Sequence, residues 1–112
     1  MAVTLTTLVQ PGNKFAINAF SADWSGGETI LAAQGAGKTI YIHELIINAV
    51  AATTFTLRDG TTTLIGPIEF VATGDSLVHI TFADPIHGTA NTALTGVAAA
   101  ANVTAIVIGE VL

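Results

Sequence analysis

Apolar and polar residues alternate along short stretches of this chain, and glycine or proline separates the stretches at close intervals. The clearest stretch is 53–58, where Phe55 and Leu57 fall on one face and threonines fall on the other. Alternation with a period of two is typical of a β-strand with one buried face. A helical period is missing nearly everywhere, and valine, isoleucine and threonine are abundant. The pattern therefore predicts an all-β chain.

These stretches give eight or nine short strands at roughly even spacing along 112 residues. A chain of this length forms one domain and leaves no room for a second core. Short, evenly spaced strands are typical of a β-sandwich or a barrel. We expect residues 1–112 to form a single antiparallel, jelly-roll-like β-sandwich, with strand breaks at Gly66-Pro67 and Asp84-Pro85.

The apolar run 40–50 changes face partway along its length. Ile40 and Ile42 lie on one face of the predicted strand, whereas Leu45 and Ile47 lie on the other. A one-residue change of phase predicts a β-bulge near His43 and Glu44. The alternative is a strand with both faces buried, one in the core and one against a partner.

The two ends of the chain also allow alternatives. Both alternating sets of 103–112 are mostly apolar, as in a central strand or a strand at a subunit interface. Residues 1–13 end in the turn signal Pro11-Gly12 and form either a first strand or an arm. Such an arm could add as an anchoring strand to a neighbouring subunit.

The composition indicates self-association. Apolar residues make up 51% of the chain and charged residues only 10%, against roughly 25% charged in typical soluble domains. A small monomer of this composition would expose apolar patches, which ordinarily mark interaction sites. We therefore expect an oligomer. The candidate interface residues are Trp24, Tyr41, Val103, Ile106, Val107 and Ile108.

The charge balance excludes several partner classes. The net charge is −5 with only three lysines and arginines, too few to follow a phosphate backbone, so we expect no nucleic-acid partner. The chain has no cysteine and therefore no disulfide or thiolate metal site. The stretch 85–109 lacks Asp, Glu, Lys and Arg, but glycine, asparagine and threonine divide it into β segments, so we expect no membrane span.

One motif resembles a phosphate-binding loop. Gly37-Lys38-Thr39 matches the end of that pattern, but the pattern needs glycine at position 32, which is Ala32. It also needs a helix after the lysine, and a β-branched run follows here. We expect a turn that leads into a strand.

No other residues form a catalytic pattern. The three histidines, His43, His79 and His87, could ligate a metal across a symmetry axis, although solvated histidines are the simpler interpretation. No serine lies in a Gly-x-Ser-x-Gly turn, and most carboxylates fall in turns where they can accept backbone hydrogen bonds. We expect no enzymatic activity, no cofactor and no metal. Trp24 and Tyr41 could stack on a sugar ring, or belong to the core or an interface.

From residue 35 onward, a series of turn-and-strand patterns resembles the capsid decoration (cement) proteins of tailed phages and related small β-sandwich virion proteins. The patterns are Gly-Ala-Gly-Lys at 35–38 before Ile-Tyr-Ile at 40–42, Phe-Thr-Leu-Arg-Asp-Gly-Thr at 55–61, Leu-Ile-Gly-Pro at 64–67, Pro-Ile-His-Gly-Thr-Ala-Asn-Thr-Ala-Leu at 85–94, and the apolar strand 103–111.

The resemblance implies a jelly-roll-like homotrimer without catalytic residues. Such a protein is made in the host cytoplasm, sits on the virion surface and binds the major capsid protein. The alternative function is a carbohydrate- or receptor-binding module of a phage tail or fibre, which would use Trp24 and Tyr41.

Overall fold

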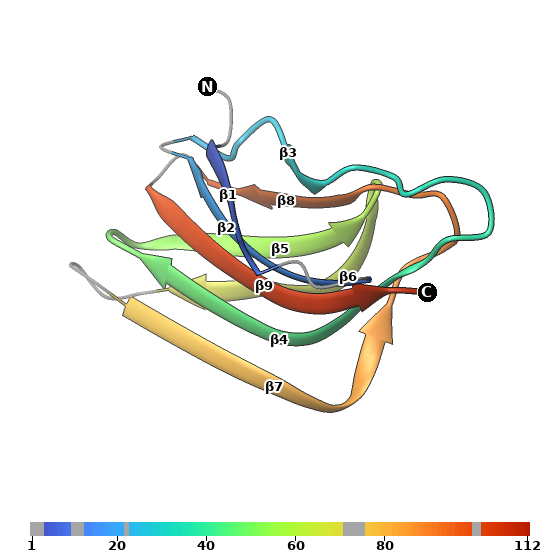
Figure 1. Ribbon diagram of the computed structural model, residues 1–112. Coiled ribbons are helices and arrows are strands. Elements are labelled where there is room, and N and C mark those ends of the chain that lie inside the picture. Colours follow the sequence, from blue (N-terminus) through green and yellow to red (C-terminus); the bar gives the residue numbers. More distant parts are fainter. Residues whose placement is uncertain (1–3, 10–12, 22, 71–75, 100–101) are drawn as a thin grey trace.

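The computed structural model describes residues 4–9, 13–21, 23–70, 76–99 and 102–112 (Figure 1). This part of the chain consists of strands and their connections, without a helix, so it holds no helix that could cross a membrane. The strands are β1 (Thr4–Val9), β2 (Lys14–Ser21), β3 (Glu28–Leu31), β4 (Ile40–Ala49), β5 (Thr53–Asp59), β6 (Thr62–Phe70), β7 (Ser76–His87), β8 (Leu94–Ala98) and β9 (Val103–Val111).

The strands form two antiparallel sheets that pack face to face (Figure 1). One sheet has the order β1-β2-β9-β4-β7 and the other has the order β3-β8-β5-β6. Without β1, the eight remaining strands divide four and four between the sheets, and the strand orders β2-β9-β4-β7 and β3-β8-β5-β6 are those of a jelly roll. β1 pairs with β2 of its own chain and extends one edge. The predicted antiparallel, jelly-roll-like β-sandwich is confirmed.

The core fills the space between the sheets, and Trp24 closes one part of it. Trp24 lies in the loop between β2 and β3, is fully buried, and meets Phe55 edge-to-face with ring centroids 5.3 Å apart. Its indole Nε1 donates a hydrogen bond to the Val103 carbonyl oxygen at 2.9 Å. A single aromatic side chain thus joins a loop, β5 and β9. The other buried apolar residues are Phe15, Ile17, Ala19, Ile30, Ile40, Ile42, Leu45, Ile47, Ala49, Leu57, Phe70, Leu94, Ala98, Val103, Ala105 and Val107.

The bulge predicted in β4 is confirmed. The pairing of β4 with both β7 and β9 shifts register between Ile42 and Glu44. Ile42 and Leu45 are both fully buried although three positions separate them. The extra residue therefore places His43 and Glu44 together on the outer side of the sheet.

The predicted turn before β4 is also present. The Lys38 backbone amide donates to the Gly35 carbonyl oxygen at 3.1 Å, and Gly37 has a φ of 77°. Glycine adopts this left-handed conformation without the steric cost that a side chain would bring. A strand rather than a helix follows at Ile40, so the loop lacks the helix end that a phosphate site requires.

The two predicted breaks at proline are wrong. β6 continues through Gly66 and the cis-linked Pro67, and β7 continues through Asp84 and Pro85. Both strands lie at the edges of their sheets, where the missing proline N–H can face away from the ladder. Register irregularities accompany both sites, and β7 bends visibly along its length (Figure 1).

Gly109 marks a close approach between strands. An added Cβ would collide with the Tyr41 backbone carbonyl oxygen and would lie 2.9 Å from Cζ of Phe15. We expect Gly109→Ala to lower the free energy of unfolding by about 1–3 kcal/mol, because the strands must separate to admit the methyl group. Urea denaturation measures the change. Gly26→Ala is the control, since no atom lies within 4 Å of its Cβ position. Equal effects at both positions would contradict close packing at Gly109.

Candidate interaction surface

The outer faces of the two sheets differ in chemistry. Strand register pairs Thr29 with Thr95 and places further threonines opposite charged and apolar residues on the outer face of the four-stranded sheet. Its residues are Thr29, Thr54, Thr56, Thr63 and Thr95, with Arg58, Glu69 and Val97. Hydroxyl and charged groups can stay hydrated there, so this face is suited to solvent exposure.

The outer face of the five-stranded sheet is apolar at its centre. Ile46 pairs with Ile106 across β4 and β9, and Ala16 pairs with Ile108 across β2 and β9. Each of these side chains is only half-buried, whereas its neighbours along the strand lie in the core. We call this surface the isoleucine face. Its apolar residues are Ala16, Phe20, Ile46, Leu77, Ile106 and Ile108.

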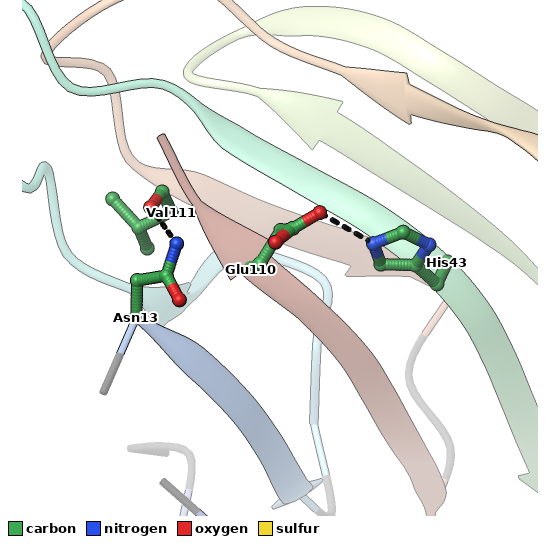
Figure 2. Close-up of polar contacts among 4 residues, drawn as sticks. All are labelled: Asn13, His43, Glu110 and Val111. Atoms are coloured by element: carbon green, nitrogen blue, oxygen red, sulfur yellow. Dashed lines mark hydrogen bonds and ion pairs between the residues drawn. The ribbon is translucent and has the colours of Figure 1, made fainter. Parts of the chain in front are cut away.

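Two histidine–carboxylate pairs cross between strands on the isoleucine face. His43 Nε2 lies 3.0 Å from Oε1 of Glu110 (Figure 2). His79 Nε2 contacts Oε2 of Glu44. The bulge makes both pairs possible, because it turns His43 and Glu44 to the same side. Pairs this exposed contribute at most about 1 kcal/mol each. Each pair gives a glutamate of this face a hydrogen-bond partner within its own chain.

A pocket of about 500 Å³ opens at one end of the isoleucine face. Ala16, Ile108 and Gly109 supply apolar lining, and Lys14 and Glu110 add polar groups. Nearby, the Asn13 side chain donates to the Val111 carbonyl oxygen at 3.1 Å and holds the start of β2 against the end of β9 (Figure 2). An apolar side chain of a partner could enter such a pocket.

The structure divides the six candidate interface residues into two groups. Tyr41, Ile106 and Ile108 lie on the isoleucine face, half-buried. Trp24, Val103 and Val107 are fully buried in the core of a single chain and therefore cannot contact a partner. β9 is central, between β2 and β4, so its two alternating sets face the core and the outer surface.

The burial of Trp24 also excludes one of the two residues proposed to stack on a sugar ring. The Trp24 ring is fully buried, so it cannot stack on a sugar. Tyr41 remains partly accessible, with its ring centroid 5.0 Å from that of His87 at a tilt of 37°.

Several other polar residues have local partners. His87 Nδ1 lies 2.8 Å from the Gly88 carbonyl oxygen. Hydrogen bonds from the side chain and backbone of Ser25 lower the pKa of the Asp23 carboxyl group below its ordinary value. Asp59 accepts hydrogen bonds from the amide and hydroxyl of Thr89. Among the residues that the structure describes, no three histidine or carboxylate groups converge as a metal site would require.

Sequence reasoning missed four members of the isoleucine face: Ala16, Phe20, Ile46 and Leu77. The signal was present in Ile46, which becomes outward-facing once the bulge at His43 is counted. For the other three, the face depends on which strands pair across long sequence separations.

Comparisons of the chain with protein-family models, with curated protein sequences and with solved structures each find no match.

Proposed function

We propose that this chain is a non-enzymatic virion structural protein that decorates and stabilises an assembled capsid as a homotrimer. The observation that carries the proposal is the contrast between the two outer faces. One face is apolar with nearly balanced charges, whereas the other is rich in threonine. A jelly roll alone carries no function, because the same fold serves many. A two-sided jelly roll suits a protein that is covered on one side and wet on the other.

The mechanism would be multivalent attachment. Three copies on one rigid trimer would engage several capsid subunits together, so the avidity would exceed the affinity of each contact. Clamping adjacent subunits would then resist their separation. The major capsid protein is the partner, and the virion surface is the location.

The competing function is a carbohydrate- or receptor-binding module. The sequence feature that most favoured this function was Trp24, but the structure buries Trp24 in the core. Tyr41 and His87 alone provide a small, tilted aromatic pair rather than an open platform. Capsid decoration is therefore the better-supported proposal.

The test combines solution mass with capsid binding. At micromolar concentration we expect about three times the chain mass of 11.4 kDa. We also expect co-sedimentation with purified capsids that lack this protein, and a higher temperature of capsid disruption after its addition. A stable monomer that neither binds capsids nor changes their disruption temperature would refute the proposal.

A further inference from the structure

We propose that copies of this chain associate through the isoleucine face, with Leu77 of one copy seated in the pocket beside Ala16 and Ile108 of the next. The inference rests on the proposed function, because it names the surface that would join the subunits of the trimer. The partner that we assign to this face is a second copy of this chain.

The first support is a projecting side chain and a pocket on the same face. Leu77 is 66% exposed, more than any other large apolar residue that the structure describes. It pairs with Asn48 near one end of β7, whereas the pocket lies over β2 and β9 near the opposite end of the face. The pocket volume of about 500 Å³ readily accepts one leucine side chain.

The Leu77 side chain cannot enter the pocket of its own chain. β9 and β4 lie between β2 and β7, so Ala16 and Leu77 are separated by three strand spacings. At ~4.8 Å per spacing this is at least ~14 Å. A Leu77 side chain that enters this pocket must therefore come from another copy.

The second support is the charge of the face. Its fixed charges are those of Lys14, Glu44 and Glu110, which sum to one net negative charge. The chain carries a net charge of −5, so most of the net negative charge lies elsewhere. Two copies can thus meet here with little repulsion, and the histidines beside both glutamates can complement carboxylates of either copy. A strongly basic or acidic partner would not meet complementary charges on this face.

The third support is the size of the face. Five strands at ~4.8 Å spacing and about nine residues at ~3.3 Å per residue give a projected area of roughly 700 Å². A standard stable interface buries about 800 Å² on each partner. Because side chains corrugate the surface, its accessible area exceeds the projected value, so this face alone is large enough.

The expected contact joins unlike patches. Leu77 and the pocket occupy different positions, so each junction pairs the projection of one copy with the pocket of another. Two copies related by a two-fold axis would exchange both contacts and form a closed dimer, whereas head-to-tail contacts close into a ring when the rotation between copies permits. A trimer is one such ring.

Cysteine cross-linking tests the contact directly. The natural chain contains no cysteine, so the double variant Ala16→Cys, Leu77→Cys has no competing thiol. A disulfide needs Cα atoms within about 7 Å, which excludes a bond inside one chain. On mild oxidation we expect covalent multiples of 11.4 kDa on a non-reducing gel. The matched control is Ala16→Cys, Leu5→Cys, because Leu5 is also exposed but pairs with the core-facing Ala19 and so points away from the isoleucine face.

A second variant measures the contribution of Leu77 to association. We expect Leu77→Ser to weaken association by about tenfold to a hundredfold, the loss expected when one leucine is no longer buried. Leu5→Ser is the control and should leave association unchanged, because Leu5 is exposed on the other side of the sheet. Circular dichroism should show an intact sandwich for both variants, because both side chains are exposed.

The outcomes separate this inference from the proposed function. Absence of cross-links above the control pair, or unchanged association of Leu77→Ser, would overturn the inference. Cross-linked multimers that fail to bind capsids would refute the capsid proposal and leave the contact established. Covalent dimers and covalent trimers both support the contact, and their number decides the trimer expectation.

Discussion

Trp24→Ala is expected to lower the free energy of unfolding by about 3–5 kcal/mol, the usual cost of truncating a large core aromatic residue. The variant removes the edge-to-face contact with Phe55 and leaves a cavity between the sheets. It also leaves the Val103 carbonyl oxygen without the hydrogen bond from the indole. Small domains have only about 5–15 kcal/mol of net stability, so this change removes a large fraction.

Urea denaturation followed by circular dichroism measures the effect of Trp24→Ala. Trp24→Phe is the matched control, because it keeps an aromatic ring but lacks the N–H donor. We expect Trp24→Phe to fall between the wild type and Trp24→Ala. If Trp24→Ala cost less than about 1 kcal/mol, the ring could not be a buried part of the core.

An aspartate introduced at two adjacent positions of β9 should affect folding at one position and self-association at the other. Val107 is fully buried between the sheets, whereas Ile106 is half-buried on the isoleucine face. We expect Val107→Asp to prevent folding, because an unpaired carboxylate in an apolar core costs several kcal/mol. We expect Ile106→Asp to retain the fold and to lose self-association, because the carboxylate stays hydrated until a partner covers it.

The comparison uses circular dichroism for folding and sedimentation for mass. Val97→Asp is the control for Ile106→Asp, because Val97 is also half-buried but faces outward from the other sheet. It should remain folded and keep the wild-type mass. A folded Val107→Asp would contradict the alternation described for β9, and an unchanged mass for Ile106→Asp would contradict burial of the isoleucine face.

The alternation of residues was enough to predict the sandwich and the bulge. The phase of apolar and polar alternation is a local property of a strand. The change of phase between Ile42 and Leu45 could therefore be predicted without knowledge of the neighbouring strands. The strand breaks at Pro67 and Pro85 were predicted wrongly because proline is disfavoured in central strands but tolerated at edges. Which strands form edges is a property of the topology, and no local pattern encodes it.

The interaction surface was only partly predictable for a similar reason. In β9, both alternating sets are apolar, so the sequence could not assign Val107 to the core and Ile106 to the surface. The sequence left Trp24 open to the core, an interface or a sugar site, because its loop is rich in glycine and serine. Its burial depends on a hydrogen bond to Val103, 79 positions later in the chain. The pocket likewise combines residues from β2, β4 and β9.

The bulge in β4 makes the length of that strand unusually tolerant at one point. Removing His43 would join Ile42, which faces inward, to Glu44, which faces outward, and would restore strict alternation along the strand. The same one-residue deletion at Ile46 would turn either half of β4 inside out, exposing Leu45 or Ile47 to water. A chain without a residue at position 43 could therefore keep the core, but it would lose both the His43–Glu110 pair and one wall of the pocket.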